Sequence, residues 1–322
     1  VFELRRAIAH MLLEFRNIRV APSQIVIGAG TDILYGLLLQ LLGFDKCYAI
    51  EDPGYSKISK LYSQYNVDFC YIPVQAQSFV AELEKSNADV VHLSPSHHFP
   101  TGKVMPIAER YRLLSWATAS PKRYIIEDDY DSELRYYGRP VPALQGLDRQ
   151  GRVVYMGALS KVLPFFIRLS YMVLPPPLMP LYEQRRGLFR QGASVPEQCV
   201  LAEYIDSGEL SRQVRRLRKE YQEKGELLGK LLVEAFVSDI VVGRLVSGVY
   251  CHIRLHSPLP EEELRRRAEQ QGCRVLSMKS FYETPSQETD KEFLLSFSKV
   301  PSCKLRDAVA ALHGAWSEKE GY

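Results

Sequence analysis

Paired cysteines are missing from this 322-residue sequence. Its six cysteines are scattered, and none belongs to a Cys-x-x-Cys pair. Their spacing argues against a zinc site and against a disulfide framework, and it favours a reducing cytoplasm as the location. Long apolar runs are missing as well, because no segment approaches the roughly 20 residues that span a bilayer. We therefore expect no membrane partner.

An excess of one charge sign is also absent. The net charge is +3, which is too small to suggest that this chain itself binds nucleic acid. The first residues carry charged side chains at once, so no secretory leader is expected. The chain opens in a helical pattern without an initiator methionine, which suggests a piece of a longer protein.

Alternating helices and strands predict an α/β fold with a mostly parallel sheet. Apolar residues at helical spacing distinguish the helices from the short apolar runs of buried strands. The expected strands lie at 25–27, 47–50, 67–72, 89–93, 124–126, 153–156 and 169–173. The expected helices lie at 3–16, 31–42, 55–65, 79–86 and 106–118.

The pattern changes near residue 207. A long charged helix is expected over 209–236, and the shorter elements after it predict a small α+β lobe at 240–243, 249–255, 260–271, 293–298 and 302–317. We expect three parts: an N-terminal helix over 1–20 that packs on the small lobe, a large domain over 21–210, and a connecting helix with the small domain over 211–322. The arginines at 212–219 could suggest DNA binding, but a solvated connecting helix explains them better.

Four segments that follow predicted strands carry the polar chemistry, and ligands of open α/β sheets lie beyond the carboxyl ends of strands. The first segment is Ala29-Gly30-Thr31, at the start of a helix that Thr31 or Asp32 could cap. Free N–H groups at such a helix start favour a phosphate. An ordinary turn would also explain the glycine.

The second and third segments supply an aromatic ring and a group of acids. Tyr55 follows the turn Asp52-Pro53-Gly54, where its ring could stack on a flat ligand or be half-buried. Glu127, Asp128 and Asp129 follow a buried strand. Because buried carboxylates are costly, these acids require a cation, a metal ion or a protonated ring nitrogen.

The fourth segment contains a lysine and an arginine at a spacing of seven residues. Lys161 follows an apolar strand and Ser160, and Arg168 comes later in the same connection. A lysine in a poorly solvated pocket is a nucleophile for carbonyl groups, and an arginine can clamp a phosphate dianion. Together the four segments supply the parts of a pyridoxal 5'-phosphate (PLP) site.

The order and spacing of these segments resemble the PLP-dependent aminotransferases of fold type I over nearly the whole chain. A closer likeness is to the MocR/GabR family of bacterial regulators, whose aminotransferase-like domain has very similar strings. These strings are Glu51–Tyr55, Pro95–Gly102, Glu127–Glu133, Leu159–Lys161 and Arg215–Arg218 before Tyr221. The resemblance implies a large domain with a mostly parallel sheet and a smaller α+β lobe.

The resemblance also implies roles for individual residues. Lys161 would form the Schiff base with PLP, and Asp128 would face the pyridine nitrogen. Tyr130 would bond the ring hydroxyl oxygen, and Tyr55 would stack on the ring. Four residues would meet the phosphate: Gly30, Thr31, Ser160 and Arg168. One histidine of the pair at 97–98 is expected near the ring.

Three departures from the aminotransferase pattern bear on function. Ala158 stands where a hydroxyl side chain usually touches the phosphate, and the string 162–168 lacks the usual Pro-Gly. Leu294 stands where aminotransferases carry the arginine that binds the substrate carboxylate, and leucine cannot form that fork. Lys57, Arg254 or Lys279 could bind a carboxylate instead, or each could be an ordinary solvated charge.

These observations favour a ligand-sensing domain over an enzyme with efficient turnover. The signal would be PLP, or an amino acid or dipeptide that forms an aldimine with it, and DNA would be bound only by an N-terminal winged-helix domain missing from this chain. A homodimer is implied by the resemblance. An aminotransferase acting on an amino acid and a metal-dependent enzyme using Asp128, Asp129 and Asp131 are the alternatives.

Overall fold

The chain folds into two compact units. The structure, a computed structural model, describes residues 1–136, 141–163, 167–188, 192–243, 247–283 and 291–317. Among these, residues 1–133 and 141–215 form the larger unit, and residues 134–136 and 216–317 form the smaller one. The structure places the boundary between the two units at 215–216. The boundary expected at 210–211 lies in the same helix, Glu209–Phe236.

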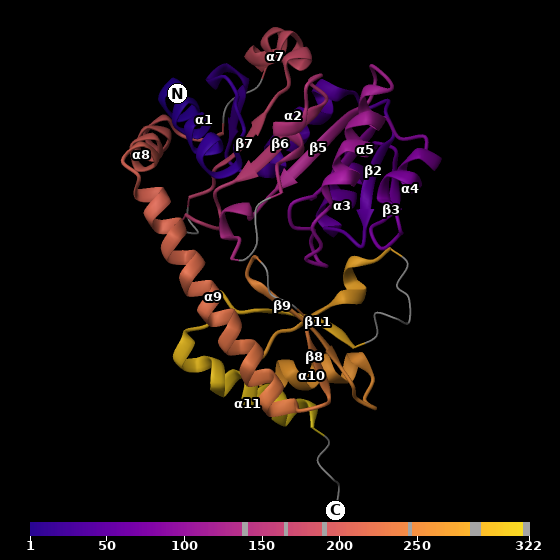
Figure 1. The fold of residues 1–322 in the computed structure, drawn as a ribbon, viewed down its shortest axis with the longest axis vertical. Coiled ribbons are helices and arrows are strands. Elements are labelled where there is room, and N and C mark those ends of the chain that lie inside the picture. Colours follow the sequence, from indigo (N-terminus) through magenta and orange to yellow (C-terminus); the bar gives the residue numbers. More distant parts are fainter. Residues whose placement is uncertain (137–140, 164–166, 189–191, 244–246, 284–290, 318–322) are drawn as a thin grey trace, which may run out of the picture. The chain divides into compact units, whose positions relative to one another are not determined.

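A mixed sheet with strand order β1-β7-β6-β5-β4-β2-β3 forms the centre of the larger unit (Figure 1). Its described strands are β1 (Ile25–Gly28), β2 (Tyr48–Asp52), β3 (Phe69–Pro73), β4 (Val90–Leu93), β5 (Tyr124–Asp129), β6 (Val153–Ala158) and β7 (Ser170–Val173). β2 to β6 run parallel, and β7 runs antiparallel to both of its neighbours. The prediction of a mostly parallel sheet is confirmed.

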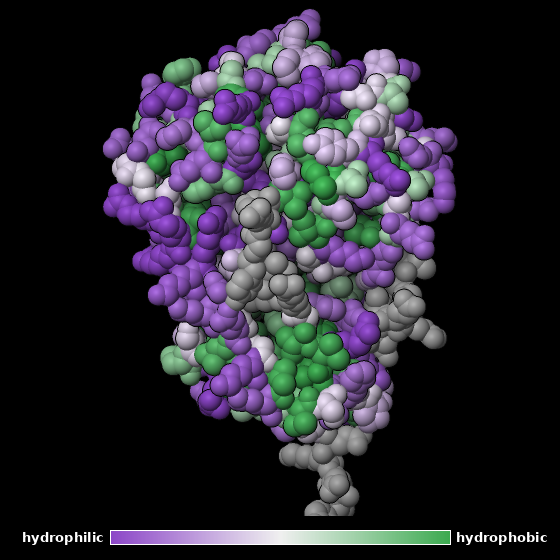
Figure 2. Space-filling model, in the orientation of Figure 1, coloured by the Kyte–Doolittle hydropathy of each residue, from purple (hydrophilic) through white to green (hydrophobic). Residues whose placement is uncertain are grey.

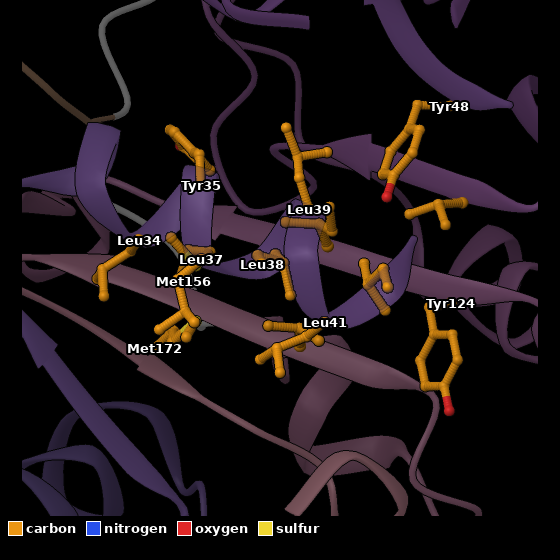
Figure 3. Close-up of a cluster of buried hydrophobic side chains, with 14 of the residues drawn as sticks. Leu34, Tyr35, Leu37, Leu38, Leu39, Leu41, Tyr48, Tyr124, Met156 and Met172 are labelled. Atoms are coloured by element: carbon orange, nitrogen blue, oxygen red, sulfur yellow. The ribbon is translucent and has the colours of Figure 1, made fainter. Parts of the chain in front are cut away.

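Helices cover this sheet. They are α1 (Phe2–Arg16), α2 (Thr31–Leu42), α3 (Ser56–Gln64), α4 (Phe79–Lys85), α5 (Ile107–Thr118), α6 (Leu144–Leu147), α7 (Met179–Arg185) and α8 (Val195–Asp206). The leucines of α2 pack on Met156 and Met172 from the central strands, as Figure 3 shows. A second core lies under α4 and α5, around Leu113 and Ile125. Each fully buried aliphatic side chain of this kind stabilises the fold by about 1.5–3 kcal/mol.

Helix α1 lies in the larger unit, where it packs against α8 and β1. The expectation that this helix packs on the small lobe is therefore wrong. The sequence shows no partner for α1 because its apolar spacing does not predict α8. Buried Leu4, Ile8 and Leu12 show that the helical spacing itself was interpreted correctly.

The smaller unit contains an antiparallel sheet of order β10-β11-β9-β8 among its described residues. The strands are β8 (Ile240–Val242), β9 (Tyr250–Leu255), β10 (Leu276–Ser277) and β11 (Glu292–Ser296), and the helices are α10 (Glu261–Gln270) and α11 (Leu305–Trp316). Its core includes Phe293, Leu295 and Trp316.

The long helix α9 (Glu209–Phe236) contributes residues to both units. Its basic residues Arg212, Arg215, Arg216 and Lys219 are at least partly exposed. Glu209 pairs with Arg212 at 2.8 Å, and Glu220 pairs with Lys224 at 2.9 Å. Figure 2 also shows mostly hydrophilic residues, in purple, on the left, where Figure 1 places α9. These pairs fit a solvated helix. None of the described helices is both long and apolar enough to cross a membrane.

Candidate functional site

The site-bearing segments meet at one edge of the larger sheet. Strand register places Ser170 beside both Gly28 and Ala158. The end of β1, the end of β6 and the start of β7 are therefore neighbours. The connection between β6 and β7 contains the predicted lysine and arginine, of which residues 164–166 lie outside the described part of the chain.

Arg168 lies against the start of α2. A side chain at position 30 would place its Cβ 3.3 Å from Nη2 of Arg168, and Gly30 has a φ of 128°, which disfavours any other residue. The helix begins at Thr31, and Gly30 is its N-cap without a side-chain hydrogen bond. Thus neither Thr31 nor Asp32 caps the helix, and the capping role that the sequence suggested for them is wrong. Uncapped N–H groups beside a guanidinium suit an anion.

Ser160 and Lys161 form a tight turn directly after β6. Leu159 donates its N–H to the carbonyl of Leu169 at 3.1 Å, and Val162 donates to the carbonyl of Leu159 at 3.1 Å. The turn is thus fixed at both sides by backbone hydrogen bonds. Ser160 is exposed and Lys161 is half-buried, so the lysine leaves the sheet at the edge where Gly30 and Arg168 lie.

The three consecutive acids do not act together, because neighbouring side chains of a strand point to opposite faces. Glu127 accepts hydrogen bonds from the N–H groups of Leu144 and Gln145 at 3.0 and 2.9 Å, which holds the start of α6. Asp129 is bound by Arg16 at 2.8 Å and by the hydroxyl of Tyr155 at 2.7 Å. Both carboxylates are buried and engaged by the protein itself.

Asp128 faces the other side of the sheet, where α2 packs. Tyr35 donates its hydroxyl hydrogen to Oδ2 of Asp128 at 2.6 Å. His92 Nε2 lies 3.7 Å from the same oxygen, and the other ring nitrogen of His92 contacts the hydroxyl of Tyr62 at 2.9 Å. Of the three acids, Asp128 is therefore the one that faces α2, the helix that begins at the Gly30–Arg168 corner.

Aromatic rings gather after the carboxyl ends of β2 and β5. Tyr55 is 53% exposed, and its ring lies edge-on to Phe99 at 6.1 Å. Phe99 lies 6.5 Å from the ring of Tyr130, whose hydroxyl contacts His97 Nδ1 at 3.1 Å. Asp131 binds the same nitrogen at 2.9 Å. Tyr55 and Tyr130, predicted from separate segments, are thus joined through one aromatic cluster.

The two neighbouring histidines have different surroundings. His98 is buried, with Nδ1 2.7 Å from the hydroxyl of Thr101 and Nε2 3.7 Å from Glu51. Burial lowers the pKa of His98 to about 3, and burial raises the pKa of Glu51 well above its ordinary value. The imidazole of His98 is therefore neutral at pH 7. The histidine beside the predicted ring-binding tyrosine is His97.

The basic residues considered for carboxylate binding each have an acidic neighbour. Lys57 contacts Asp32 at 2.6 Å, and Lys279 lies 3.7 Å from Glu261. Arg254 forms an ion pair with Glu292 in the smaller sheet. Leu294 is buried in β11. In the described part of the chain, no group of three or more His, Cys, Asp or Glu side chains could hold a metal ion.

Sequence reasoning missed the residues that support this site. Tyr35, Tyr62 and His92 resemble ordinary core residues, and Arg16 is far from its partner along the chain. The one available signal was spacing, because Tyr35 lies one helical turn after Thr31 and must share its face of α2.

The edge of the sheet and its lysine–arginine connection define a class of protein. Residues 2–312 match the family described as aminotransferase class I and II, and the chain belongs to this family. Kynurenine aminotransferase of Pyrococcus horikoshii shares the fold with a TM-score of 0.83 at 22% identity, over 100% of this chain and 81% of that one. LysN, an α-aminoadipate aminotransferase of Thermus thermophilus, gives 0.83 at 22% identity, over 98% and 81%.

More similar relatives are regulators. An uncharacterized HTH-type transcriptional regulator of Bacillus subtilis, YdeL, is 34% identical over 98% of this chain and 68% of its own length. MocR of Rhizobium meliloti, a probable rhizopine catabolism regulatory protein, is 30% identical over 97% of this chain and 63% of its own length. The chain thus spans about two thirds of these relatives, and the predicted likeness to the MocR/GabR family is confirmed. The prediction of PLP as the cofactor is confirmed with the family.

Proposed function

We propose that this chain is the effector-sensing domain of a MocR/GabR-type transcription regulator and that it senses its signal through bound PLP. The observation that carries the proposal is the Gly30–Arg168 corner beside the Lys161 turn, in a chain whose relatives include regulators. We infer that the regulator binds DNA through a helix-turn-helix domain, as the names of the longer relatives suggest. A homodimer in the cytoplasm belongs to the same proposal.

The described residues fit the cofactor at both ends. The uncapped start of α2 and Arg168 supply N–H groups and a positive charge for the phosphate, with Gly30, Thr31 and Ser160 around it. Asp128 is held on the face where a ring nitrogen would need a carboxylate. Lys161 would carry the cofactor covalently, Tyr130 would bond its ring hydroxyl, and Tyr55 would cover its face. PLP, when bound, supplies a carbonyl that reacts with amines and a ring that withdraws electrons.

The site favours sensing over turnover because it lacks a dedicated carboxylate clamp among the described residues considered for that role. Leu294 takes the place of the arginine, and Lys57, Arg254 and Lys279 are each neutralised by an acid. Without that fork, an amino acid would be oriented poorly for rapid chemistry. Binding of PLP, an amino acid or a dipeptide would instead shift a conformational equilibrium through its differential affinity for the two states.

The first test is the absorbance of the purified chain after incubation with PLP. We expect a visible band for the wild type, complete loss of that band for Lys161→Ala, and no change for Lys85→Ala. Lys85 is an exposed lysine paired with Glu82 and is the matched control. A wild type that gains no band with PLP, or a Lys161→Ala variant that keeps it, would contradict the site assignment.

An aminotransferase is the second candidate. It is favoured by the presence of Lys161, the residue for the covalent chemistry, and by the aromatic-amino-acid aminotransferase 1 of Thermococcus litoralis, which is 23% identical over 96% of this chain. Steady transfer of an amino group to a keto acid over many turnovers would support it. The sensor proposal expects at most a slow single turnover.

A further inference from the structure

We propose that Tyr35 is a positioning residue for the cofactor: its hydroxyl fixes Asp128 so that the carboxylate can hold the protonated ring nitrogen. This inference rests on the proposed PLP site and assigns a role to a side chain outside the set predicted from the sequence. The geometry that carries it is the 2.6 Å hydrogen bond from the Tyr35 hydroxyl to Oδ2 of Asp128.

Tyr35 is part of a rigid support. It lies in α2 between Leu34 and the leucines that pack on the sheet, and it is only 5% exposed (Figure 3). Because α2 also begins at the Gly30–Thr31 corner, one helix bears both the proposed phosphate site and the partner of Asp128. A side chain fixed by core packing can hold a carboxylate within the narrow geometry that a cofactor needs.

The direction of this hydrogen bond is settled by the protonation of Tyr35. Burial, with the charge of Asp128 beside it, raises the pKa of Tyr35 well above its ordinary value, so the hydroxyl keeps its proton and donates it. Hydrogen bonds to an ionised acceptor are short and strong. The described contacts of Asp128 with Tyr35 and His92 both involve Oδ2, which leaves Oδ1 as the oxygen for the ring nitrogen.

The groups around Asp128 form a shell of buried polar side chains. Tyr62, whose pKa burial raises well above its ordinary value, keeps its proton, and its hydroxyl lies 2.9 Å from Nδ1 of His92. Nε2 of His92 lies 3.7 Å from Oδ2 of Asp128. Glu51 is the further titratable neighbour, and Asp128 contributes to its raised pKa. Among these groups, Tyr35 makes the short direct bond.

The test is the pH titration of the visible band of the PLP-loaded chain. A positive charge on the ring nitrogen favours loss of the proton from the nitrogen that links Lys161 to the cofactor, so a weaker hold by Asp128 raises the midpoint. We expect Asp128→Asn to raise it most and Tyr35→Phe to raise it by about one pH unit, a tenfold change. Tyr48→Phe is the matched control, because this buried tyrosine of the same core donates to the Gly43 carbonyl.

A second measurement separates positioning from a general loosening of the fold. Each variant is reloaded with 1-deaza-PLP, in which carbon replaces the ring nitrogen. We expect Tyr35→Phe and the wild type to titrate alike with this analogue. An equal shift with both cofactors, or a Tyr35→Phe midpoint equal to that of the wild type with PLP while Asp128→Asn moves, would overturn the role of Tyr35. A wild type without a visible band would overturn the proposed function as well.

Discussion

At the residue scale, Arg16 and Asp129 form a buried ion pair in the larger unit. Their side chains are 6% and 2% exposed, and Arg16 also donates to Ser96 at 2.7 Å. The charge of Asp129 helps to hold the pKa of Arg16 above its ordinary value despite burial. The pair anchors the end of α1 to the end of β5, beside Asp128.

We expect Asp129→Asn to lower the free energy of unfolding by about 3–5 kcal/mol, because it leaves a buried guanidinium without its counter-charge. Urea denaturation measures this loss. The control is Asp206→Asn, which removes the partner of the exposed Arg6 and should cost no more than about 1 kcal/mol. Equal losses in the two variants would contradict the special weight given to the buried pair.

Glu133, the last acid of the Glu127–Glu133 string, makes stability depend on pH. Burial raises its pKa from 4.5 to about 8. Between these values the folded chain keeps a proton that the unfolded chain releases, so stability falls as pH rises through the window. The slope is at most about 1.4 kcal/mol per pH unit.

We expect Glu133→Gln to remove this slope. The free energy of unfolding of the variant should therefore rise relative to that of the wild type as pH increases from about 5 to about 8. Urea denaturation at several pH values is the measurement. Glu82→Gln, at an acid paired with the exposed Lys85, should keep the wild-type slope. A constant difference between Glu133→Gln and the wild type over this range would contradict the assignment.

The residues that the sequence proposes for the site are those with local signals. The seven-residue spacing of Lys161 and Arg168 can be seen in the sequence without knowledge of the packing. Gly30 before α2 indicates a backbone conformation with positive φ. Asp128 was chosen among three acids by resemblance alone, whereas the alternation of the strand explains the choice physically. The contacts of Arg16 and Tyr35 could not be predicted, because their partners lie far away in the chain and only the folded sheet brings them together.

At the element scale, helix α9 ends in a strained residue. Val237, directly after Phe236, has a φ of 51° and is 74% exposed. A β-branched residue in the left-handed region costs roughly 1–2 kcal/mol. The exposed side chain offers little packing to offset this strain.

We expect Val237→Gly to raise the free energy of unfolding by about 0.5–1 kcal/mol, after the greater entropy of unfolded glycine is subtracted. Val233→Gly, one turn earlier and half-exposed, should have the opposite sign, because glycine weakens a helix interior. Thermal or urea denaturation distinguishes the two. Destabilisation by both variants would show that the strain is relieved elsewhere.

Apolar spacing in the sequence predicts most of the helices and strands, and helix α8 shows why it fails for others. The long helix was expected over 209–236 and spans Glu209–Phe236. Helix α8 was missed because exposed Val195 and Val200 blur its apolar face. Its start could have been found from Ser194, whose hydroxyl accepts the N–H of Glu197 at 3.3 Å, with a proline in the first turn. Missing α8 led directly to the wrong position of α1.

At the scale of the whole molecule, the proposed regulator should be a dimer. Exposed apolar side chains on the larger unit, among them Phe2, Val195 and Val200, fit a surface that is covered in solution. We expect sedimentation equilibrium to give twice the mass of one chain, with and without PLP. A monomer at all concentrations would contradict the proposed dimer without affecting the cofactor site.

The number of residues between Thr31 and Tyr35 fixes the direction in which Tyr35 points from the axis of helix α2. Thr31 begins the helix and Tyr35 follows one turn later, so the corner near Arg168 and the bond to Asp128 share one helical phase. A single residue inserted between them would turn Tyr35 by about 100° around the helix axis. Every chemical group would still be present, yet the hydroxyl would no longer face its carboxylate. Insertions within this turn should therefore be tolerated far less than substitutions on its exposed side.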